Sequence, residues 1–167
     1  MKIGQPAPEF NLPDLTGQLH RLSDTSGLIV LVNFWSAECP HSQRTDAALV
    51  SALKSRAPAA SFISIASNRN EPIDLLRREA ARRHLPLVLL DQDHAVADLY
   101  EAIATPHVFI LDERGILRYQ GAVDDAIFGQ TLARRNYVQE ALEALQSGRS
   151  PSLTETPAFG CAIVREI

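Results

Sequence analysis

Long apolar runs and cysteine are both scarce in this chain of 167 residues. The longest apolar stretch, residues 28–35, is interrupted by Asn33 and is far shorter than the roughly 20 residues of a membrane-spanning helix, so no span is expected. With only two cysteines, the fold is not expected to depend on a disulfide framework. A chain of this length buries enough surface to fold around one ordinary hydrophobic core.

Positive charge is not in excess either. The chain has 16 Lys and Arg against 20 Asp and Glu, a net charge of -4, so no nucleic-acid or anionic-lipid partner is expected. The first residues lack the apolar segment of a signal peptide, which predicts a cytoplasmic protein. If a signal peptide has been removed, the alternative is a periplasmic or other extracytoplasmic location, and two cysteines fit either compartment.

Strand-like and helix-like patterns alternate along the chain. The predicted strands are residues 28–35, 61–66, 87–91, 108–111 and 116–120, and the predicted helices are residues 39–56, 71–84, 93–101 and 131–146. The last two strands flank Gly115, which is typical of a hairpin turn. This order predicts an α/β fold with a mixed central sheet and helices on both faces.

The segment after the last predicted helix, residues 148–167, has no clear period and contains Pro151 and Pro157. We expect an extended C-terminal tail that lies over the domain and adds a short strand. The chain has neither repeats nor low-complexity tracts. Residues 1–167 are therefore expected to form one domain.

Cys39 lies where a predicted strand passes into a helix, and Pro40 suits the first helical turn because its missing N–H costs nothing there. A sulfur at that position is close to unpaired backbone N–H groups and to the positive end of the helix dipole, which favour the thiolate. A protonated His41 would add to this effect. The alternative is that Cys39 is a small buried hydrophobic residue and that His41 is an exposed polar residue.

Three segments resemble the thioredoxin superfamily, in its redoxin branch of TlpA/ResA-like thiol–disulfide oxidoreductases and AhpC/TSA peroxiredoxin-like proteins. They are Ile3-Gly4-x-Pro6-Ala7-Pro8-x-Phe10-x-Leu12, Phe34-Trp35-x-x-x-Cys39-Pro40 and Thr105-Pro106-x-x-Phe109-Ile110-Leu111-Asp112-x-x-Gly115. The ending Gly160-Cys161-x-Ile163 is similar to that of some uncharacterised redoxins. The resemblance covers nearly the whole chain and implies a thioredoxin-like fold with Cys39 as its redox-active residue.

The resemblance also implies the walls of the substrate site. Pro106 corresponds to the cis-proline of the superfamily, which would expose the backbone of Thr105 for pairing with a substrate peptide. Trp35 would pack beside the thiol, although a plain core aromatic is the alternative. Glu38 would oppose formation of a thiolate, whereas His41 would favour it.

Departures from the family pattern bear on mechanism. Thioredoxins carry Cys-x-x-Cys, whereas this chain has Cys39-Pro40-His41-Ser42, and the Ser42 hydroxyl cannot form a disulfide. The only other internal thiol is Cys161, 122 positions later. Cys161 is therefore either a distant resolving cysteine or a packed residue. If it is remote, glutathione or a partner thiol must complete the cycle.

Peroxide reduction requires additional groups that hold the substrate oxygens. Of the three supporting positions of peroxiredoxins, Ser36 fits one, whereas Val32 and Pro106 stand where a proline and an arginine are usual. A copper site built from the two cysteines with His41 or His107 lacks the Cys-x-x-x-Cys spacing of copper chaperones, and we expect neither metal nor cofactor.

Three hypotheses follow. The first is a thiol–disulfide oxidoreductase that acts on a disulfide-containing protein or a small disulfide such as that of glutathione, with Cys39 as nucleophile and Trp35, Pro40, His41, Ser42, Thr105 and Pro106 around it. The second is a peroxiredoxin-like thiol peroxidase, an antioxidant with peroxide as substrate. The third is a thioredoxin-fold binding module without catalysis.

Overall fold

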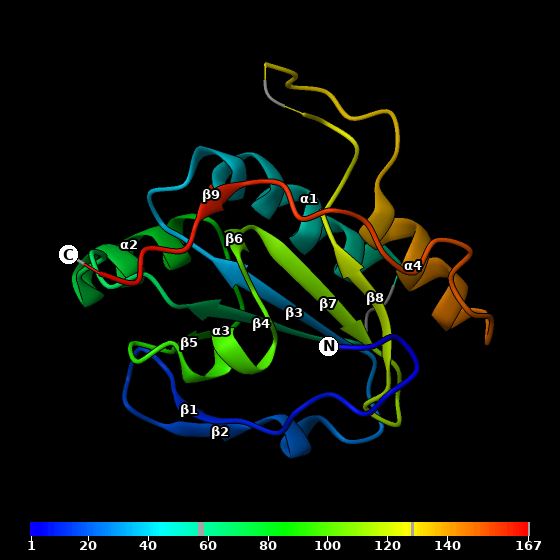
Figure 1. Ribbon diagram of the computed structural model, residues 1–167, viewed down its shortest axis with the longest axis horizontal. Helices are drawn as coiled ribbons and strands as arrows, with labels where there is room; N and C mark the ends of the chain where they lie inside the picture. Colours follow the sequence, from blue (N-terminus) through cyan, green and yellow to red (C-terminus); the bar gives the residue numbers. More distant parts are fainter. Residues whose placement is uncertain (57–58, 128, 167) are drawn as a thin grey trace.

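The computed structural model describes residues 1–56, 59–127 and 129–166. Its centre is a five-stranded mixed sheet with the order β5-β4-β3-β7-β8 (Figure 1). The strands are β3 (Val30–Trp35), β4 (Ser61–Ala66), β5 (Val88–Leu90), β7 (His107–Leu111) and β8 (Leu117–Gly121). β3, β4 and β5 run parallel, whereas β7 runs antiparallel to β3, and β8 runs antiparallel to β7. The sequence prediction of a mixed sheet is confirmed.

Helices cover both faces of this sheet. They are α1 (Pro40–Arg56), α2 (Ile73–Arg82), α3 (Ala95–Leu99) and α4 (Tyr137–Gln146), with a short 3-10 helix, η1 (Leu22–Thr25). Residues of α1, α2 and α4 are buried against one face. The other face is covered by α3 and by an N-terminal hairpin of β1 (Asn11–Pro13) and β2 (Leu19–Arg21), which was not among the predicted strands.

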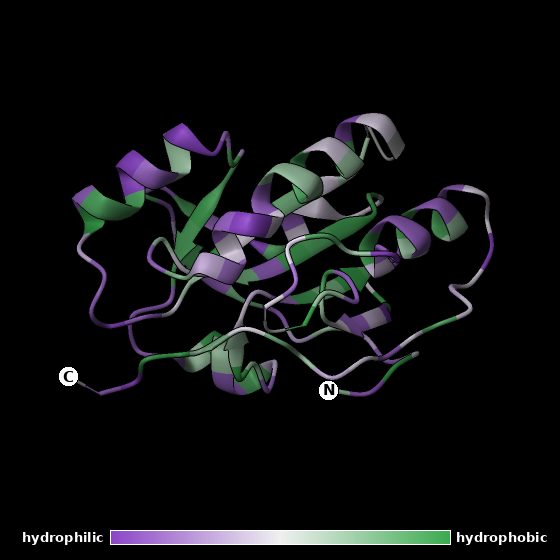
Figure 2. Ribbon diagram, turned by 90° about the horizontal axis from the view of Figure 1, so that it is seen from above, coloured by the Kyte–Doolittle hydropathy of each residue, from purple (hydrophilic) through white to green (hydrophobic). Residues whose placement is uncertain are grey.

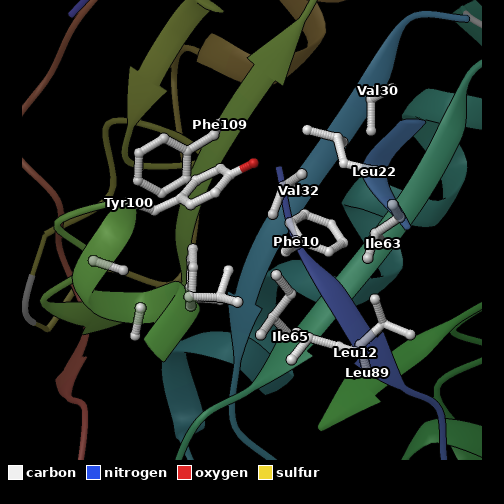
Figure 3. Packing of buried hydrophobic residues seen from close by; sticks show 14 of the residues in the cluster. Phe10, Leu12, Leu22, Val30, Val32, Ile63, Ile65, Leu89, Tyr100 and Phe109 are labelled. Atoms are coloured by element: carbon white, nitrogen blue, oxygen red, sulfur yellow. The ribbon is translucent and has the colours of Figure 1, made fainter. Parts of the chain in front are cut away.

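All six side chains of β3 are buried because this strand is central and both of its faces are covered. Leu31 points into the cluster with α1 and α4, whereas Val32 belongs to the cluster with the hairpin and α3. Figure 3 shows the second cluster, in which Phe10 and Leu12 lie against the sheet. Figure 2 shows mostly hydrophobic strands inside the molecule and many hydrophilic residues on the outer helices. No helix of the described segments is long and apolar enough to cross a membrane.

The prediction of a helix over residues 131–146 was wrong at its start, because α4 begins only at Tyr137. The side chain of Asn136 accepts a hydrogen bond from the backbone N–H of Gln139 at 2.8 Å and so caps the helix. The backbone N–H groups of Arg134 and Arg135 donate to the Asp125 carboxylate instead of entering helical hydrogen bonds. The sequence pattern gave no sign of this competing turn.

The C-terminal tail is extended and lies across the end of the sheet (Figure 1). Its first attachment is to β8, where the backbone of Gln120 bonds to Thr154 and Thr156. Further along, β9 (Cys161–Ala162) pairs antiparallel with β6 (Ala104–Thr105). The expected tail with a short added strand is thus present.

Candidate active site

Cys39 follows the loop that leaves β3 and directly precedes Pro40, the first residue of α1. Its carbonyl oxygen accepts the backbone N–H of Gln43 at 3.0 Å, the first hydrogen bond of the helix. The side chain is only 3% exposed. The cysteine therefore occupies the helix start that the sequence predicts, where the N–H groups of the first turn point toward it.

Cys161 lies beside Cys39 although 122 positions separate them. The two Sγ atoms are 2.7 Å apart, and both residues are free thiols. Cys39 Sγ is also 2.9 Å from the carbonyl oxygen of Thr105, to which the thiol donates. The pairing of β6 with β9 produces this arrangement because Thr105 and Cys161 are register partners. Sequence alone left this distance open.

The surroundings give the two thiols opposite acidities. Burial raises the pKa of Cys39, but hydrogen bonds from the Cys161 thiol and the Ser42 backbone N–H outweigh burial, so the pKa falls below its usual value. Burial raises the pKa of Cys161 to about 12, and the neighbouring charge of Cys39 adds to the rise. The charge of Glu71 raises it further. Cys39 is thus the more acidic thiol of the pair, and Cys161 is the less acidic one.

Glu71 is a site residue that the sequence analysis did not single out. Its Oε1 accepts the hydroxyl of Ser36 at 2.7 Å and the backbone N–H of Glu38 at 2.8 Å. The Ser36 hydroxyl oxygen in turn accepts the backbone N–H of Cys39 at 3.0 Å. One available signal was that an acidic residue soon after β4 lies near the end of the adjacent parallel strand β3.

Glu71 is buried, and burial raises the pKa of its carboxyl group although the Ser36 hydroxyl and the Glu38 N–H oppose the shift. Its Oε2 atom has no hydrogen-bond partner among the described residues. The site therefore contains a buried carboxyl group with a raised pKa, and its charge acts on Cys161.

The Thr105–Pro106 peptide bond is cis, as the resemblance implies. The backbone of Thr105, expected to be open for a substrate peptide, is instead paired with Cys161 of the chain's own tail. Gly160 makes this close approach possible, because a Cβ atom there would lie 2.1 Å from the Thr105 carbonyl oxygen. The tail therefore covers the edge at which a substrate peptide is expected.

Three other expected site residues, Pro40, His41 and Ser42, lie in the first turn of α1. Pro40 is exposed at the start of α1, and Ser42 is buried with a hydroxyl that lacks a partner in the described part of the chain. The ring of His41 meets the ring of Phe159 edge to face, with centroids 5.0 Å apart. His41 thus contacts the tail, and the lowered pKa of Cys39 comes from other groups.

Trp35 is completely buried and belongs to the core beneath α2. Its indole N–H donates to Asp46 at 2.9 Å, and the guanidinium of Arg83 lies 5.5 Å from the ring centroid. Arg83 also donates to Asp46 at 3.0 Å and to the carbonyl oxygen of Ala37. This network fixes the loop between β3 and Cys39 to both α1 and α2.

No group of three or more His, Cys, Asp or Glu residues in the described ranges is arranged to hold a metal ion. His107, considered as a copper ligand, lies on β7 with its ring 4.5 Å from that of Phe109. Burial lowers the pKa of His107 to about 4, so this ring is neutral at pH 7.

The sheet order, the cysteine at the start of α1 and the cis-proline beside it define a class, the thioredoxin-fold proteins of thiol chemistry. Residues 3–120 match the family model described as the AhpC/TSA family. The chain therefore belongs to the AhpC/TSA family and is an oxidoreductase. The matched range ends before the tail, so Cys161 lies outside it.

Relatives with established names agree with this class. Over 114 residues the chain is 31% identical to "Thiol-disulfide oxidoreductase ResA" of Geobacillus kaustophilus, which covers 68% of this chain and 65% of the relative. It is 26% identical over 134 residues to "Thiol:disulfide interchange protein DsbE" of Allochromatium vinosum, covering 78% of this chain and 73% of the relative. The chain is thus similar to thiol–disulfide oxidoreductases of the ResA and DsbE kind.

Solved structures confirm the fold. An uncharacterised conserved protein from Geobacillus kaustophilus superimposes with a TM-score of 0.90 at 27% identity, covering 99% of this chain and 93% of that one. The thioredoxin domain of a thiol-disulfide oxidoreductase from Bacteroides vulgatus gives a TM-score of 0.64 at 22% identity, with 72% and 88% covered. The second likeness shows a thioredoxin-like fold, and the first extends through the tail.

Proposed function

We propose that this protein exchanges thiols and disulfides with Cys39 as the nucleophile and Cys161 as the resolving cysteine. The observation that carries the proposal is the 2.7 Å separation of the two Sγ atoms. Because a disulfide bond is about 2.05 Å long, a movement of less than one ångström brings the two sulfur atoms to bonding distance. Ser42 cannot take this part because a hydroxyl forms no disulfide.

Two displacement steps make up the reductive half of the cycle. The thiolate of Cys39 attacks one sulfur of a substrate disulfide, a mixed disulfide forms, and the other substrate sulfur leaves as a thiolate. Deprotonated Cys161 then attacks Cys39 Sγ, and the first substrate sulfur leaves as a second thiolate. The substrate gains two electrons, and the protein is left with a Cys39–Cys161 disulfide. A dithiol, or two molecules of a thiol such as glutathione, returns the electrons.

The lowered pKa of Cys39 favours two steps of the cycle. It favours the thiolate that attacks the substrate, and it makes Cys39 the better leaving group when the Cys39–Cys161 disulfide is reduced again. Cys161 must lose its proton before it attacks, and its burial makes this step difficult without a base. We assign Glu71 as that base. The charge of its buried carboxyl group raises the pKa of Cys161, so the two groups interact, and its Oε2 is free of partners within the described residues.

The substrates that this chemistry fits are a disulfide-bonded protein or a small disulfide such as that of glutathione. The interchange proteins among the relatives carry names of the same chemistry. The alternative function for the same thiolate is peroxide reduction, but no contact among the described site residues favours it. The Ser36 hydroxyl, which matches a peroxiredoxin position, already bonds to Glu71 and to the Cys39 N–H, and Val32 is buried in the sheet.

Stopped-flow kinetics of the reduced protein with glutathione disulfide and with hydrogen peroxide at one pH test the proposal. We expect the disulfide to react faster, and Cys39→Ser to abolish both reactions. In Cys161→Ser the reaction should stop at the mixed disulfide, with one glutathione per chain bound to Cys39, because the resolving thiol is missing. Peroxide consumption orders of magnitude faster than disulfide exchange would establish the peroxidase instead, and no reaction with either would leave only the binding module.

A further inference from the structure

The tail crosses the active site as a strand that carries its own cysteine. Residues 159–163, here called the strap, include β9, whose Cys161 is the register partner of Thr105 on β6. The same register brings the Cys161 sulfur to 2.7 Å from that of Cys39. A substrate peptide that added to the edge of β6 in this register would present its cysteine to Cys39 in the same way.

The residue before the cysteine is restricted by backbone atoms. A Cβ at Gly160 would lie 2.1 Å from the carbonyl oxygen and 2.6 Å from the carbonyl carbon of Thr105. Contacts below 3.0 Å do not occur for real Cβ atoms, and backbone cannot move aside as a flexible side chain can. A strand therefore fits this edge only with glycine directly before its cysteine.

The other residues of the strap differ in how far their side chains contact the protein. Ile163, two residues after the cysteine, is 7% exposed and packs in the cluster that contains Val96 and Ala102. Phe159 places its ring against His41, whereas Ala162 is exposed. A peptide that follows the path of the strap would thus have an aromatic residue, glycine, cysteine, any residue and an aliphatic residue, in that order.

The strap is held mainly at its C-terminal end, by the two residues that follow it. The backbone N–H of Val164 donates to Asn68 at 2.9 Å, its carbonyl oxygen accepts the N–H of Arg69 at 3.1 Å, and Arg165 pairs with Asp98. Pairing with β6 involves only two residues of β9. Release of this end therefore frees the edge while residues 154–156 stay attached to β8.

We propose that in the resting protein the strap occupies the edge of β6, where the resemblance places a substrate peptide, and that an extended Gly-Cys segment of a protein substrate replaces the strap in the same register. This inference rests on the proposed function. The Cys39 thiolate attacks the sulfur of the substrate cysteine in its disulfide, and the partner sulfur leaves as a thiolate. The returning strap then brings Cys161 to Cys39, a disulfide forms between them, and the peptide leaves as a thiolate.

The test uses three disulfides that share 2-nitro-5-thiobenzoate as leaving group: the peptide Pro-Ala-Phe-Gly-Cys-Ala-Ile-Val, the same peptide with alanine in place of glycine, and glutathione. The protein variants are Cys161→Ser, which keeps the strap, and Ile163→Ser and Gly160→Ala in that background, which release it by two different routes. Stopped-flow release of the coloured thiolate gives each second-order rate constant. Circular dichroism and alkylation of Cys39 verify that each variant is folded.

We expect the glycine peptide to react at least about tenfold faster than the alanine peptide. Release of the strap should raise the rate of the glycine peptide by about tenfold or more and leave glutathione within about threefold. Equal rates for the two peptides in all variants, or an equal rise for peptide and glutathione, would overturn the inference, because the strap would then only shield the thiol. If Cys39 alkylates but exchanges with none of the three, the proposed function itself fails.

Discussion

Cys39 and Cys161 carry the same functional group, and their surroundings give it opposite properties. Cys39 stands at a helix start and receives hydrogen bonds that stabilise its charged form, so its pKa is lowered. Cys161 sits on the tail beside that charge, and its pKa is raised to about 12. The proposed division into nucleophile and resolving thiol therefore rests on the local contacts of each sulfur.

A pair of substitutions at position 161 tests this account of Cys39. Serine keeps an O–H that can donate to the Cys39 thiolate, whereas alanine cannot donate, so Cys161→Ala removes a hydrogen bond that favours the charged form. We expect the pH midpoint of iodoacetamide alkylation of Cys39 to be higher in Cys161→Ala than in Cys161→Ser.

Neither variant retains a second thiol, so every alkylation event reports on Cys39 alone. Equal midpoints in the two variants would show that the side chain at position 161 does not support the thiolate. A midpoint in Cys161→Ser at or above that of an ordinary cysteine, about 8.5, would contradict the lowered pKa itself.

At this scale the sequence predicted the helix-start position of Cys39 but not its neighbours. Pro40 and the adjacent strand pattern are local signals, and local signals are enough to place a helix start. Glu71 and Cys161 reach the site through chain segments distant in sequence, so their contacts depend on strand order and register. Those are properties of the whole sheet and cannot be read from neighbouring residues.

Among the elements, α1 and α2 are joined through a buried ion pair. Arg83, directly after α2, donates to Asp46 of α1 at 3.0 Å, and the two side chains are 6% and 1% exposed. Burial raises the pKa of Asp46, and the hydrogen bonds from Trp35 and Arg83 oppose that rise. The pair fixes the relative positions of the two helices next to the loop that leads to Cys39.

We expect Arg83→Ala to lower the free energy of unfolding by about 3–5 kcal/mol, because it leaves a buried carboxylate without its partner. Adding Asp46→Asn should recover part of the loss, since the uncompensated charge is then removed. The matched control is Arg82→Ala. Arg82 pairs with Glu79 on the surface, and its loss should cost about 1 kcal/mol or less.

Urea denaturation of the variants measures these differences. Similar losses for Arg82→Ala and Arg83→Ala would show that burial of the pair does not matter. A double variant as unstable as the sum of its single substitutions would likewise contradict the coupling between Arg83 and Asp46.

The elements themselves were largely predictable where apolar periodicity was strong. The strands and helices that build the central layers follow from patterns such as the buried run in β3. The start of α4 could not be predicted from such a pattern, because Asn136 caps the helix while the Asp125 carboxylate binds the preceding backbone. The two-residue strands β6 and β9 were too short to carry a period, although together they form the edge beside Cys39.

On the scale of the whole molecule, the tail links β8, at one edge of the sheet, to the hydrophobic cluster that α3 covers. The Thr156 hydroxyl forms a hydrogen bond with the hydroxyl of Tyr119 on β8. Ile163 is buried in the same hydrophobic cluster as Phe10 from the N-terminal segment. Because the tail adds side chains to the same core, we propose that residues 1–167 form one domain. The same path carries Cys161 to Cys39, so the fold of the tail and the chemistry of the site depend on each other.

The pairing of Cys39 with Cys161 is the central claim, and mapping the disulfide in oxidised protein tests it most directly. The reduced protein is treated with a small excess of glutathione disulfide, its remaining thiols are alkylated, and its proteolytic peptides are analysed by mass spectrometry. We predict one intramolecular Cys39–Cys161 disulfide and no retained glutathione, because the resolving sulfur is 2.7 Å from the nucleophile. A stable glutathione adduct on Cys39 together with an alkylated Cys161 would contradict the account.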